Sequence, residues 1–172
     1  MTASLGVGCI YLINNFLSGH IRMRGRNNCS YPFNCLEMFE TVFGNEPNTI
    51  DVCSCNVSGW FTVDINATSK PSVVDDGQVL TSIEDNSFNR VRIDPSYNHK
   101  TAKKMYGTDL PASIKLLRAG SRVIKSGSLM FLLLRPQNYQ ICTNDTKRVG
   151  LIFLSIIPSN KCRCLNIYYK YG

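Results

Sequence analysis

Three apolar runs near the C-terminus constrain the fold of this 172-residue chain more than any other feature. They cover residues 128–134, 149–157 and 162–171. The first is closed by an Arg-Pro pair and the second by Pro-Ser-Asn. Short apolar runs bounded by turn residues are typical of strands buried in a sandwich or barrel. We therefore predict adjacent antiparallel strands here, whose almost fully buried side chains are Leu129, Phe131, Leu133, Leu151, Phe153 and Ile156.

Shorter segments upstream show the same kind of pattern. Residues 20–24, 61–66 and 90–94 alternate polar and apolar side chains, as half-buried strands do. Residues 77–81 predict a shorter strand, and the apolar residues 5–17 predict the first strand of the fold. Together with the C-terminal runs, these segments give seven or eight predicted strands.

One helix is predicted with clear boundaries, over residues 35–43. Asn34 precedes it as an N-cap, and Glu37 follows three residues later, which is a helix-start pattern. Phe39 and Phe43 fall on one face of such a helix, and Gly44 is suited to end it. We expect that face to pack against the sheet.

Residues 111–119 admit two interpretations. Pro111 and Gly120 would begin and end a short helix. Ile114, Leu116 and Arg118 also alternate as they would in a strand. The sequence leaves this choice open.

The order of these segments lacks a strand–helix–strand rhythm. It favours an all-β protein, an antiparallel β-sandwich of about eight strands arranged as a jelly roll with one short helix. At this length, residues 1–172 predict a single domain with one core.

The pattern also resembles a known family. Residues 16–24 place a small residue before alternating basic and apolar residues, and the predicted helix follows. Residues 91–97 run from a strand into a proline and an aromatic, and residues 127–133 form a Gly-led strand. This order is similar to that of the single jelly-roll coat proteins of small icosahedral, picorna-like viruses. The resemblance implies a non-enzymatic capsid subunit that assembles in many copies, found in the virion or host cytoplasm.

Charge is divided unevenly along the chain. Residues 1–69 hold three arginines against five acidic residues, whereas residues 95–172 hold thirteen lysines and arginines against two. Such a division favours a positive surface that contacts nucleic acid, although surface cations kept for solubility give the same pattern. The candidate nucleic-acid contacts are Arg22, Arg24, Arg26, Lys103, Lys104, Arg118, Arg122, Lys125, Lys147 and Arg148.

Eight cysteines permit two interpretations of the redox state. A chain long enough to form a core does not need disulfides, so we favour buried, reduced thiols. The alternative is a secreted β-sandwich with paired cysteines and glycosylated Asn-X-Ser/Thr sites that binds a host or partner protein.

Residues suited to catalysis are few. His20 and His99 are the only histidines, and neither belongs to a recognisable catalytic or metal-binding motif. We therefore predict no catalytic residues, no metal and no cofactor, and treat a small enzyme on a β-sandwich as the third interpretation. No apolar run approaches the roughly 20 residues of a membrane-spanning helix.

Overall fold

The computed structural model describes residues 2–4, 8–13, 16–24, 35–53, 60–96, 98–136, 141–157 and 161–172. Side chains are described from residue 36 onward within these ranges, except at residues 156, 157 and 161. Three α-helices and one 3₁₀ helix accompany the strands of the described part. The elements are, in chain order, β1 (Thr2–Ser4), β2 (Gly8–Ile13), β3 (Phe16–Arg24), α1 (Cys35–Phe43), β4 (Thr49–Val52), β5 (Phe61–Asp64), η1 (Ala67–Ser69), β6 (Val73–Val74), β7 (Phe88–Ile93), α2 (His99–Tyr106), α3 (Ser113–Val123), β8 (Ile124–Leu134), β9 (Thr146–Ile157) and β10 (Lys161–Lys170).

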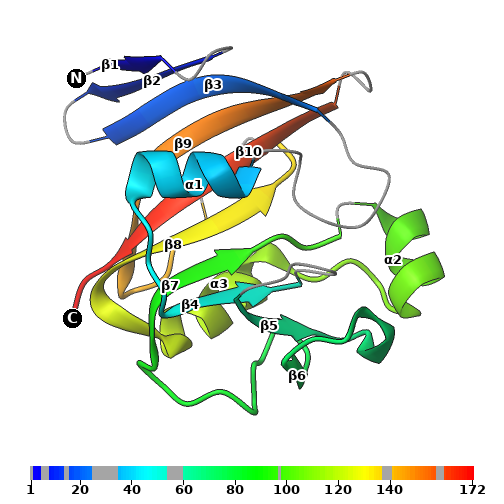
Figure 1. Cartoon of the computed structure of the whole chain (residues 1–172). Coiled ribbons are helices and arrows are strands. Elements are labelled where there is room, and N and C mark those ends of the chain that lie inside the picture. The colour runs from blue at the N-terminus through cyan, green and yellow to red at the C-terminus, as the bar shows by residue number, and fades with distance from the viewer. Residues whose placement is uncertain are drawn as a thin grey trace.

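All these strands belong to one twisted sheet, with helices on both of its faces (Figure 1). The strand order is β1-β2-β3-β9-β10-β8-β7-β4-β5-β6. The pairs β4–β5, β4–β7, β5–β6, β7–β8 and β3–β9 are parallel. The remaining pairs, including both pairs that β10 makes, are antiparallel. The predicted antiparallel jelly-roll sandwich is therefore wrong, because a single mixed sheet replaces two packed antiparallel sheets.

Short connections between parallel strands explain this error. A parallel crossover usually takes a dozen or more residues and contains an α-helix. Here residues 53–60 join β4 to β5, and residues 65–72, with only the 3₁₀ turn η1, join β5 to β6. The helical periodicity that normally marks a parallel sheet in a sequence is thus missing from the first half of this one.

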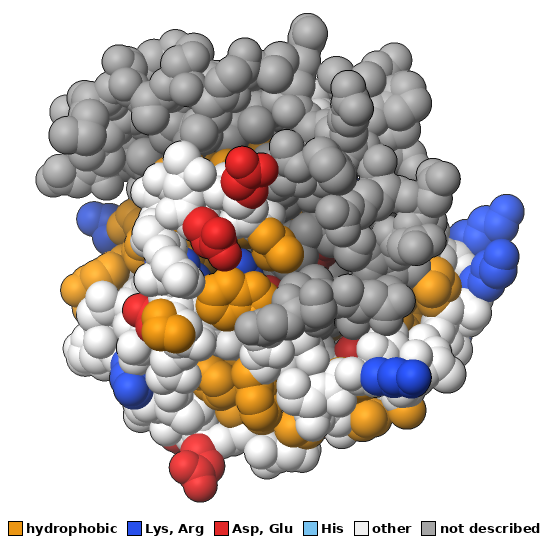
Figure 2. Space-filling view, in the orientation of Figure 1, with side chains coloured by type: hydrophobic (Ala, Val, Ile, Leu, Met, Phe, Trp, Pro, Cys, Tyr) orange, Lys and Arg blue, Asp and Glu red, His pale blue; other side chains and the backbone are white. Residues whose placement is uncertain are grey.

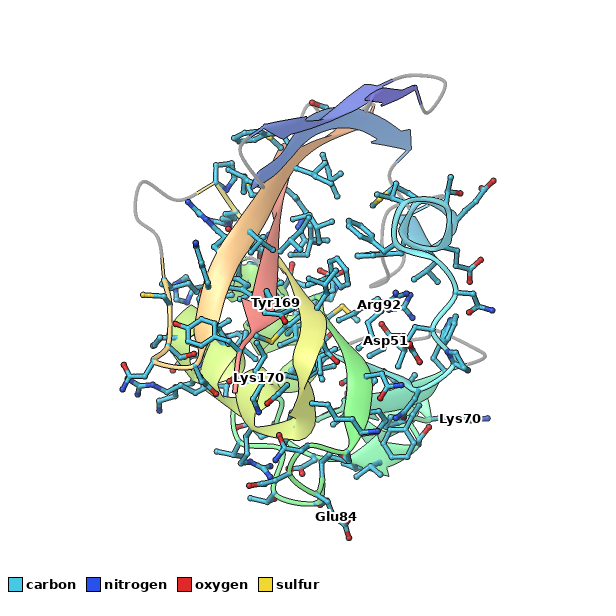
Figure 3. All side chains as sticks on the ribbon, turned by 90° about the vertical axis from the view of Figure 1, so that its left-hand side faces the viewer. Asp51, Lys70, Glu84, Arg92, Tyr169 and Lys170 are labelled. Carbon is cyan, nitrogen blue, oxygen red and sulfur yellow. The ribbon has the colours of Figure 1, made fainter. Side chains whose placement is uncertain are left out.

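Each face of the sheet has its own core. On one face α3 packs on β7 and β8, and Leu116, Leu117 and Val123 join an apolar cluster with strand residues such as Ile50 and Val91. On the other face α1 contributes Met38 and Phe39 to a cluster with residues of β8, β9 and β10. The side view shows α1 and α3 on opposite sides of the strands (Figure 3).

The predicted helix over residues 35–43 is confirmed as α1. Phe39 is fully buried, and its ring centroid lies 4.9 Å from that of Phe131 on β8. The Phe43 ring lies 4.6 Å from the same ring, so both aromatic residues face the sheet as expected. The predicted cap, Asn34, lies outside the described residues.

The open choice at residues 111–119 is settled in favour of a helix. These residues fall mostly within α3, whose buried residues include Leu116, Leu117, Gly120 and Val123. A Cβ at Gly120 would overlap the sulfur of Met130 and lie 3.0 Å from Ile93 Cδ1. Glycine therefore lets α3 lie directly on the sheet.

The C-terminal apolar runs form β8, β9 and β10 as strands, but their neighbours differ from the prediction. β10 lies between β8 and β9, so these two strands are not adjacent. Phe131 and Leu133 are buried, Leu129 and Leu151 are half-buried, and Phe153 is 39% exposed. Phe153 points away from the α1 face, and α3 covers β7 and β8 rather than β9. The side chain of Ile156 lies outside the described residues.

Two further comparisons with the sequence concern residues 77–81 and the cysteines. The strand predicted at 77–81 is a turn, in which Leu80 has a left-handed φ of 52°. The four cysteines whose side chains are described, Cys53, Cys142, Cys162 and Cys164, are free thiols, of which Cys142 and Cys162 are exposed rather than buried. Among the described helices, none is both long enough and apolar enough to cross a membrane.

Candidate active site

The order in which strands are added to the sheet reverses beside β4, which creates a topological switch point. From β4 the chain builds β5 and β6 on one side of the sheet, and then returns to place β7 and β8 on the other side. The segments that leave β4 and β7 therefore diverge at the carboxyl ends of these two strands. In open α/β sheets, ligands bind in the crevice at such a switch point.

Backbone contacts fix the three strand ends at this position. The Cys53 N–H donates to the Val63 carbonyl at 2.8 Å, and the Asp94 N–H donates to the Val52 carbonyl at 3.1 Å. Cys53 itself has a left-handed φ of 58°. A Cβ at Gly77 would lie 2.7 Å from Val52 Cγ1 and 2.9 Å from Cys53 Sγ, so glycine permits the loop after β6 to approach the end of β4.

A pocket opens where these segments meet, and we refer to it as the switch-point pocket. Its cavity volume is about 60 Å³, within a wider hollow of about 490 Å³ that includes open solvent. Helix α2 contributes Ala102 and Tyr106 to its wall. The strand ends and loops contribute Cys53, Asp64, Asp76, Gly77, Gln78 and Ser96.

Two carboxylates of the pocket come from the β5 and β6 ends. Asp64 is the last residue of β5 and is 1% exposed, and its Oδ1 accepts the Asn66 N–H at 2.8 Å. Asp76 Oδ1 accepts the backbone N–H of Gln78 at 2.9 Å. An acidic residue near the end of the second strand of such a unit is the group that binds ribose hydroxyls in nucleotide-binding folds.

The loop that carries Asp76 is held by the preceding residue. Asp75 accepts the N–H groups of Ser82 and Asp76, each at 2.7 Å, and the hydroxyl of Thr81. Burial opposes ionisation of Asp75, but the hydrogen bonds from Ser82 and its neighbours outweigh it and lower the pKa of this carboxyl. Asp75 therefore organises the loop as an ionised carboxylate.

The Cys53 thiol is unsuited to nucleophilic chemistry. Burial raises its pKa far above the usual value, and the charges of Asp64, Asp94 and Asp76 raise it further. A nucleophilic cysteine needs a lowered pKa and an electropositive environment. The chemistry that the pocket supports is therefore that of its carboxylates.

The third carboxylate of the pocket wall is Asp109. Asp94 is not part of that wall, but it follows β7 directly and lies two residues before Ser96, which is part of it. The side chains of Asp94 and Arg163 are 8% and 5% exposed, and Arg163 Nη2 lies 2.6 Å from Asp94 Oδ1. Burial raises the pKa of Asp94, while the charge and hydrogen bond of Arg163 oppose the increase.

A buried ion pair between Arg92 of β7 and Asp51 of β4 lies on the face of the sheet that α1 partly covers (Figure 3). Arg92 Nε donates to Asp51 Oδ1 at 2.8 Å, and Arg92 Nη2 lies 2.5 Å from Asp51 Oδ2. The guanidinium also lies 4.8 Å from the centroid of the Trp60 ring and 5.5 Å from that of Phe39. With both charges buried and paired, this group is structural.

The cations singled out from the sequence are divided between different regions. Lys103 and Lys104 lie exposed on α2, beside the switch-point pocket. Lys125 and Lys147 lie at the amino-terminal ends of β8 and β9, at the opposite edge of the sheet. Arg118 is exposed on α3.

Three of the predicted contacts are engaged within the protein. Lys103 Nζ lies 3.1 Å from Asp109 Oδ1, and both of these side chains are exposed. Arg122 donates to the carbonyls of Leu80 and Ile83 and pairs with Asp85. Arg148 donates to Asn166 Oδ1 at 3.2 Å. The side chains of Arg22 and Arg24, and all of Arg26, lie outside the described residues. Contact with nucleic acid itself stays a prediction.

Sequence reasoning missed the carboxylates of the site, although a signal for them exists. Asp64 lies within the alternating segment 61–66, and Asp94 ends the alternating segment 90–94. These two residues lie at the ends of β5 and β7, the strands on either side of β4, and an acidic residue after the second strand is a feature of α/β nucleotide sites. In an antiparallel sandwich the two strand ends would carry no such meaning.

Comparisons with known proteins show the fold. No protein-family model matches the chain, and no curated protein matches it. Among solved structures, TrmN from Thermus thermophilus is similar over 78% of this chain and 47% of its own, with a TM-score of 0.55 and 9% sequence identity. The chain therefore spans about half the length of that protein.

Two further solved structures are more distant. PH0851 is similar over 77% of this chain and 45% of its own, with a TM-score of 0.44 and 10% identity. The antibiotic-resistance methyltransferase Kmr is similar over 87% of this chain and 98% of its own, with a TM-score of 0.43 and 11% identity. TM-scores this low carry no argument, so the fold assignment rests on TrmN and on the observed topology.

These findings overturn the resemblance to viral coat proteins. The mixed sheet with its helices resembles the Rossmann-like methyltransferase fold and is not a jelly roll. The prediction of a non-enzymatic capsid subunit is wrong, because it rested on a jelly-roll fold that the chain does not have. The assembly of many copies and the virion location were inferred from the same resemblance, and these findings test neither of them.

Proposed function

We propose that this protein is a methyltransferase that uses a sulfonium donor of the S-adenosylmethionine type. The observation that carries the proposal is the switch-point pocket, with Asp64 at the carboxyl end of β5, in a sheet of the Rossmann-like methyltransferase kind. Function does not follow from fold alone, so the site residues must support it.

The residues of the pocket fit the nucleoside part of such a donor. The buried Asp64 carboxylate suits a pair of ribose hydroxyls, which need a hydrogen-bond acceptor. The Asp76 carboxylate and the Gln78 side chain offer polar contacts for a base, while Ile65 and Tyr106 supply apolar surface. When bound, the donor supplies an electrophilic methyl group attached to a positively charged sulfur.

The acceptor end of the site is formed by the segment after β7. Asp94 and Ser96 follow the strand that borders the switch point, opposite the β5 and β6 ends that would hold the nucleoside. An ionised Asp94 accepts hydrogen bonds only, so it suits an acceptor that presents an N–H group. We infer methylation of a nitrogen.

The surface beside the pocket supports a polyanionic substrate. Lys100, Lys103 and Lys104 are exposed on α2, and basic side chains project from the side of the molecule where α2 lies (Figure 2). Over α1, acidic side chains occupy the surface instead, from Glu37 and Glu40. Basic side chains beside a pocket suit contact with phosphates, and we propose that the methylated nitrogen belongs to a nucleic acid.

Donor binding is the first test. The purified protein should bind S-adenosylhomocysteine in isothermal titration calorimetry, and Asp64→Asn should weaken binding at least tenfold because the amide loses one acceptor oxygen. Glu84→Gln is the matched control, since Glu84 is an exposed carboxylate in the turn before β7, away from the pocket. Equal affinities for wild type and Asp64→Asn would overturn the assignment of the pocket.

Methyl transfer is the second test. The protein should transfer label from methyl-tritiated donor to RNA or single-stranded DNA, and the labelled nitrogen can be identified after digestion to nucleosides. Lys103→Glu combined with Lys104→Glu should raise KM for the nucleic acid and make its further rise with salt less steep, because fewer phosphate contacts remain to be screened. The affinity for S-adenosylhomocysteine should stay unchanged. Label in protein alone would reject the nucleic-acid substrate while sparing the methyltransferase.

A further inference from the structure

Arg163 contacts the candidate acceptor-binding carboxylate from a distant strand. It lies on β10, and its guanidinium extends across β8, near the carboxyl end of that strand, to reach Asp94 directly after β7. The same Nη2 donates to the Leu133 carbonyl of β8 at 3.0 Å. Two acceptors thus fix the position of the guanidinium, and with it the position of the carboxylate.

The other charged or titratable groups near Asp94 do not replace Arg163. The Cys53 thiol lies after β4 and stays protonated because burial raises its pKa. On β7 itself, Arg92 is committed to Asp51 through two hydrogen bonds. Among the described residues, Arg163 is the cation whose charge and hydrogen bond favour the ionised form of Asp94.

We propose that Arg163 is a positioning residue of the methyl-transfer site, which keeps Asp94 ionised and correctly oriented as the hydrogen-bond acceptor for the substrate N–H. This inference rests on the proposed function. It assigns to a residue outside the pocket wall a role that is distinct from ordinary stabilisation of the fold. Replacing Arg163 should therefore change the protonation of Asp94 and leave binding of the nucleoside part of the donor almost unchanged.

The chemistry explains why the ionised form matters. The nitrogen lone pair forms the new bond to the methyl carbon, while the carbon–sulfur bond breaks and its electron pair stays on sulfur. The nitrogen then loses its proton to water. Throughout the step, Asp94 must accept the hydrogen bond from the nitrogen, and a protonated carboxyl would present a donor in its place.

The pair can be tested without any activity assay. Side-chain ¹³C-labelled aspartate allows the Asp94 carboxyl to be titrated by NMR, with Asp94→Asn giving the assignment. Arg163→Met should shift the midpoint upward by at least one pH unit, because burial then acts without its counter-charge. Arg163→Lys should recover most of the shift, and Arg118→Met, which removes an exposed arginine from α3, should leave it unchanged. An unchanged midpoint in Arg163→Met would overturn the proposal.

The pH profile connects the pair to turnover. In Arg163→Met, the pH below which kcat declines should rise by the same interval as the Asp94 midpoint. At pH values below this decline, kcat should be about tenfold lower than in wild type for each pH unit of that shift. KM for the donor should stay within twofold, and Arg163→Lys should restore the wild-type pH dependence. If Arg163→Met does not fold, as circular dichroism would show, Arg163→Lys against Arg163→Gln provides the same contrast.

The outcomes separate this proposal from the function on which it rests. If wild-type protein neither binds S-adenosylhomocysteine nor transfers methyl groups, the proposed function fails and the catalytic role of the pair fails with it. If wild type is active and the acid limb of kcat is the same in Arg163→Met, only the role of Arg163 is overturned.

Discussion

One face of the sheet has two halves that are buried in different ways. Under α1, the strands β8, β9 and β10 present apolar residues such as Phe131, Ile152 and Leu165. Farther along the same face, β4, β5 and β7 present buried polar residues instead. These are Thr49, Asp51, Thr62, Asp64, Arg90 and Arg92, all no more than 8% exposed.

The difference corresponds to a division of roles. The apolar half supplies burial, which is the main favourable contribution to folding. Burying the polar side chains of the other half costs desolvation free energy, and this cost is tolerated where the charges are paired, as in Asp51–Arg92. Arg90 connects the halves, because it donates to the carbonyls of Phe43 and Gly44 at the end of α1. The candidate site lies at the edge of the polar half.

The largest expected effect comes from breaking the buried ion pair. Asp51→Leu leaves the Arg92 charge buried without its carboxylate, and we expect a loss of about 3–5 kcal/mol in the free energy of unfolding. The double variant Asp51→Leu/Arg92→Met removes both charges and should recover most of that loss. Urea unfolding of both variants measures the difference. A double variant no more stable than the single one would mean that the charges do not act as a pair.

A smaller effect is expected in the apolar half. Phe131→Ala should cost about 3 kcal/mol, since the residue is buried and touches the rings of both Phe39 and Phe43. Phe153→Ala provides the comparison, because that side chain is 39% exposed and should cost only about 1 kcal/mol. Equal losses at the two positions would contradict the assignment of the core to the α1 face.

Local sequence patterns predict most elements of both halves, including β5 within the alternating segment 61–66. The helix at residues 35–43 and the strands β7 to β10 were predicted, because their apolar patterns and turn residues are local. Residues 49–52 were missed as a strand, since four residues give too short a pattern to recognise. Helix α3 was left open although Leu116, Leu117, Gly120 and Val123 repeat at helical spacing.

Local sequence patterns do not show whether two paired strands run parallel or antiparallel. Parallel strands are usually revealed by the helices between them, and residues 53–60 and 65–72 are too short to contain one. Without that signal, alternating strands favoured the antiparallel sandwich. The site was lost with the fold, because Asp64 and Asp94 gain their meaning only when their strands run in the same direction.

The next prediction concerns the loop that carries Asp76 and Gln78. Asp75→Asn should cost about 1–2 kcal/mol at neutral pH, through weaker hydrogen bonds from the Ser82 and Asp76 N–H groups. Because the pKa of Asp75 is lower in the folded state, its contribution is present above the unfolded pKa and is lost as the pH falls through the folded value. The stability difference from wild type should therefore shrink in acid. A constant difference between pH 7 and pH 3 would reject an ionic role for Asp75.

The smallest expected effect tests whether α2 is organised by its cap. Asn98 Oδ1 accepts the Thr101 N–H at 2.7 Å at the start of α2, and Asn98→Ala should cost about 1 kcal/mol. Asn98→Asp keeps the acceptor and places a negative charge at the helix N-terminus, so it should retain wild-type stability. Because Ala102 and Tyr106 of this helix form part of the pocket wall, Asn98→Ala should also weaken binding of S-adenosylhomocysteine. Calorimetry on the two variants decides the matter: a loss of stability with unchanged affinity would show that the pocket does not depend on the first turn of α2.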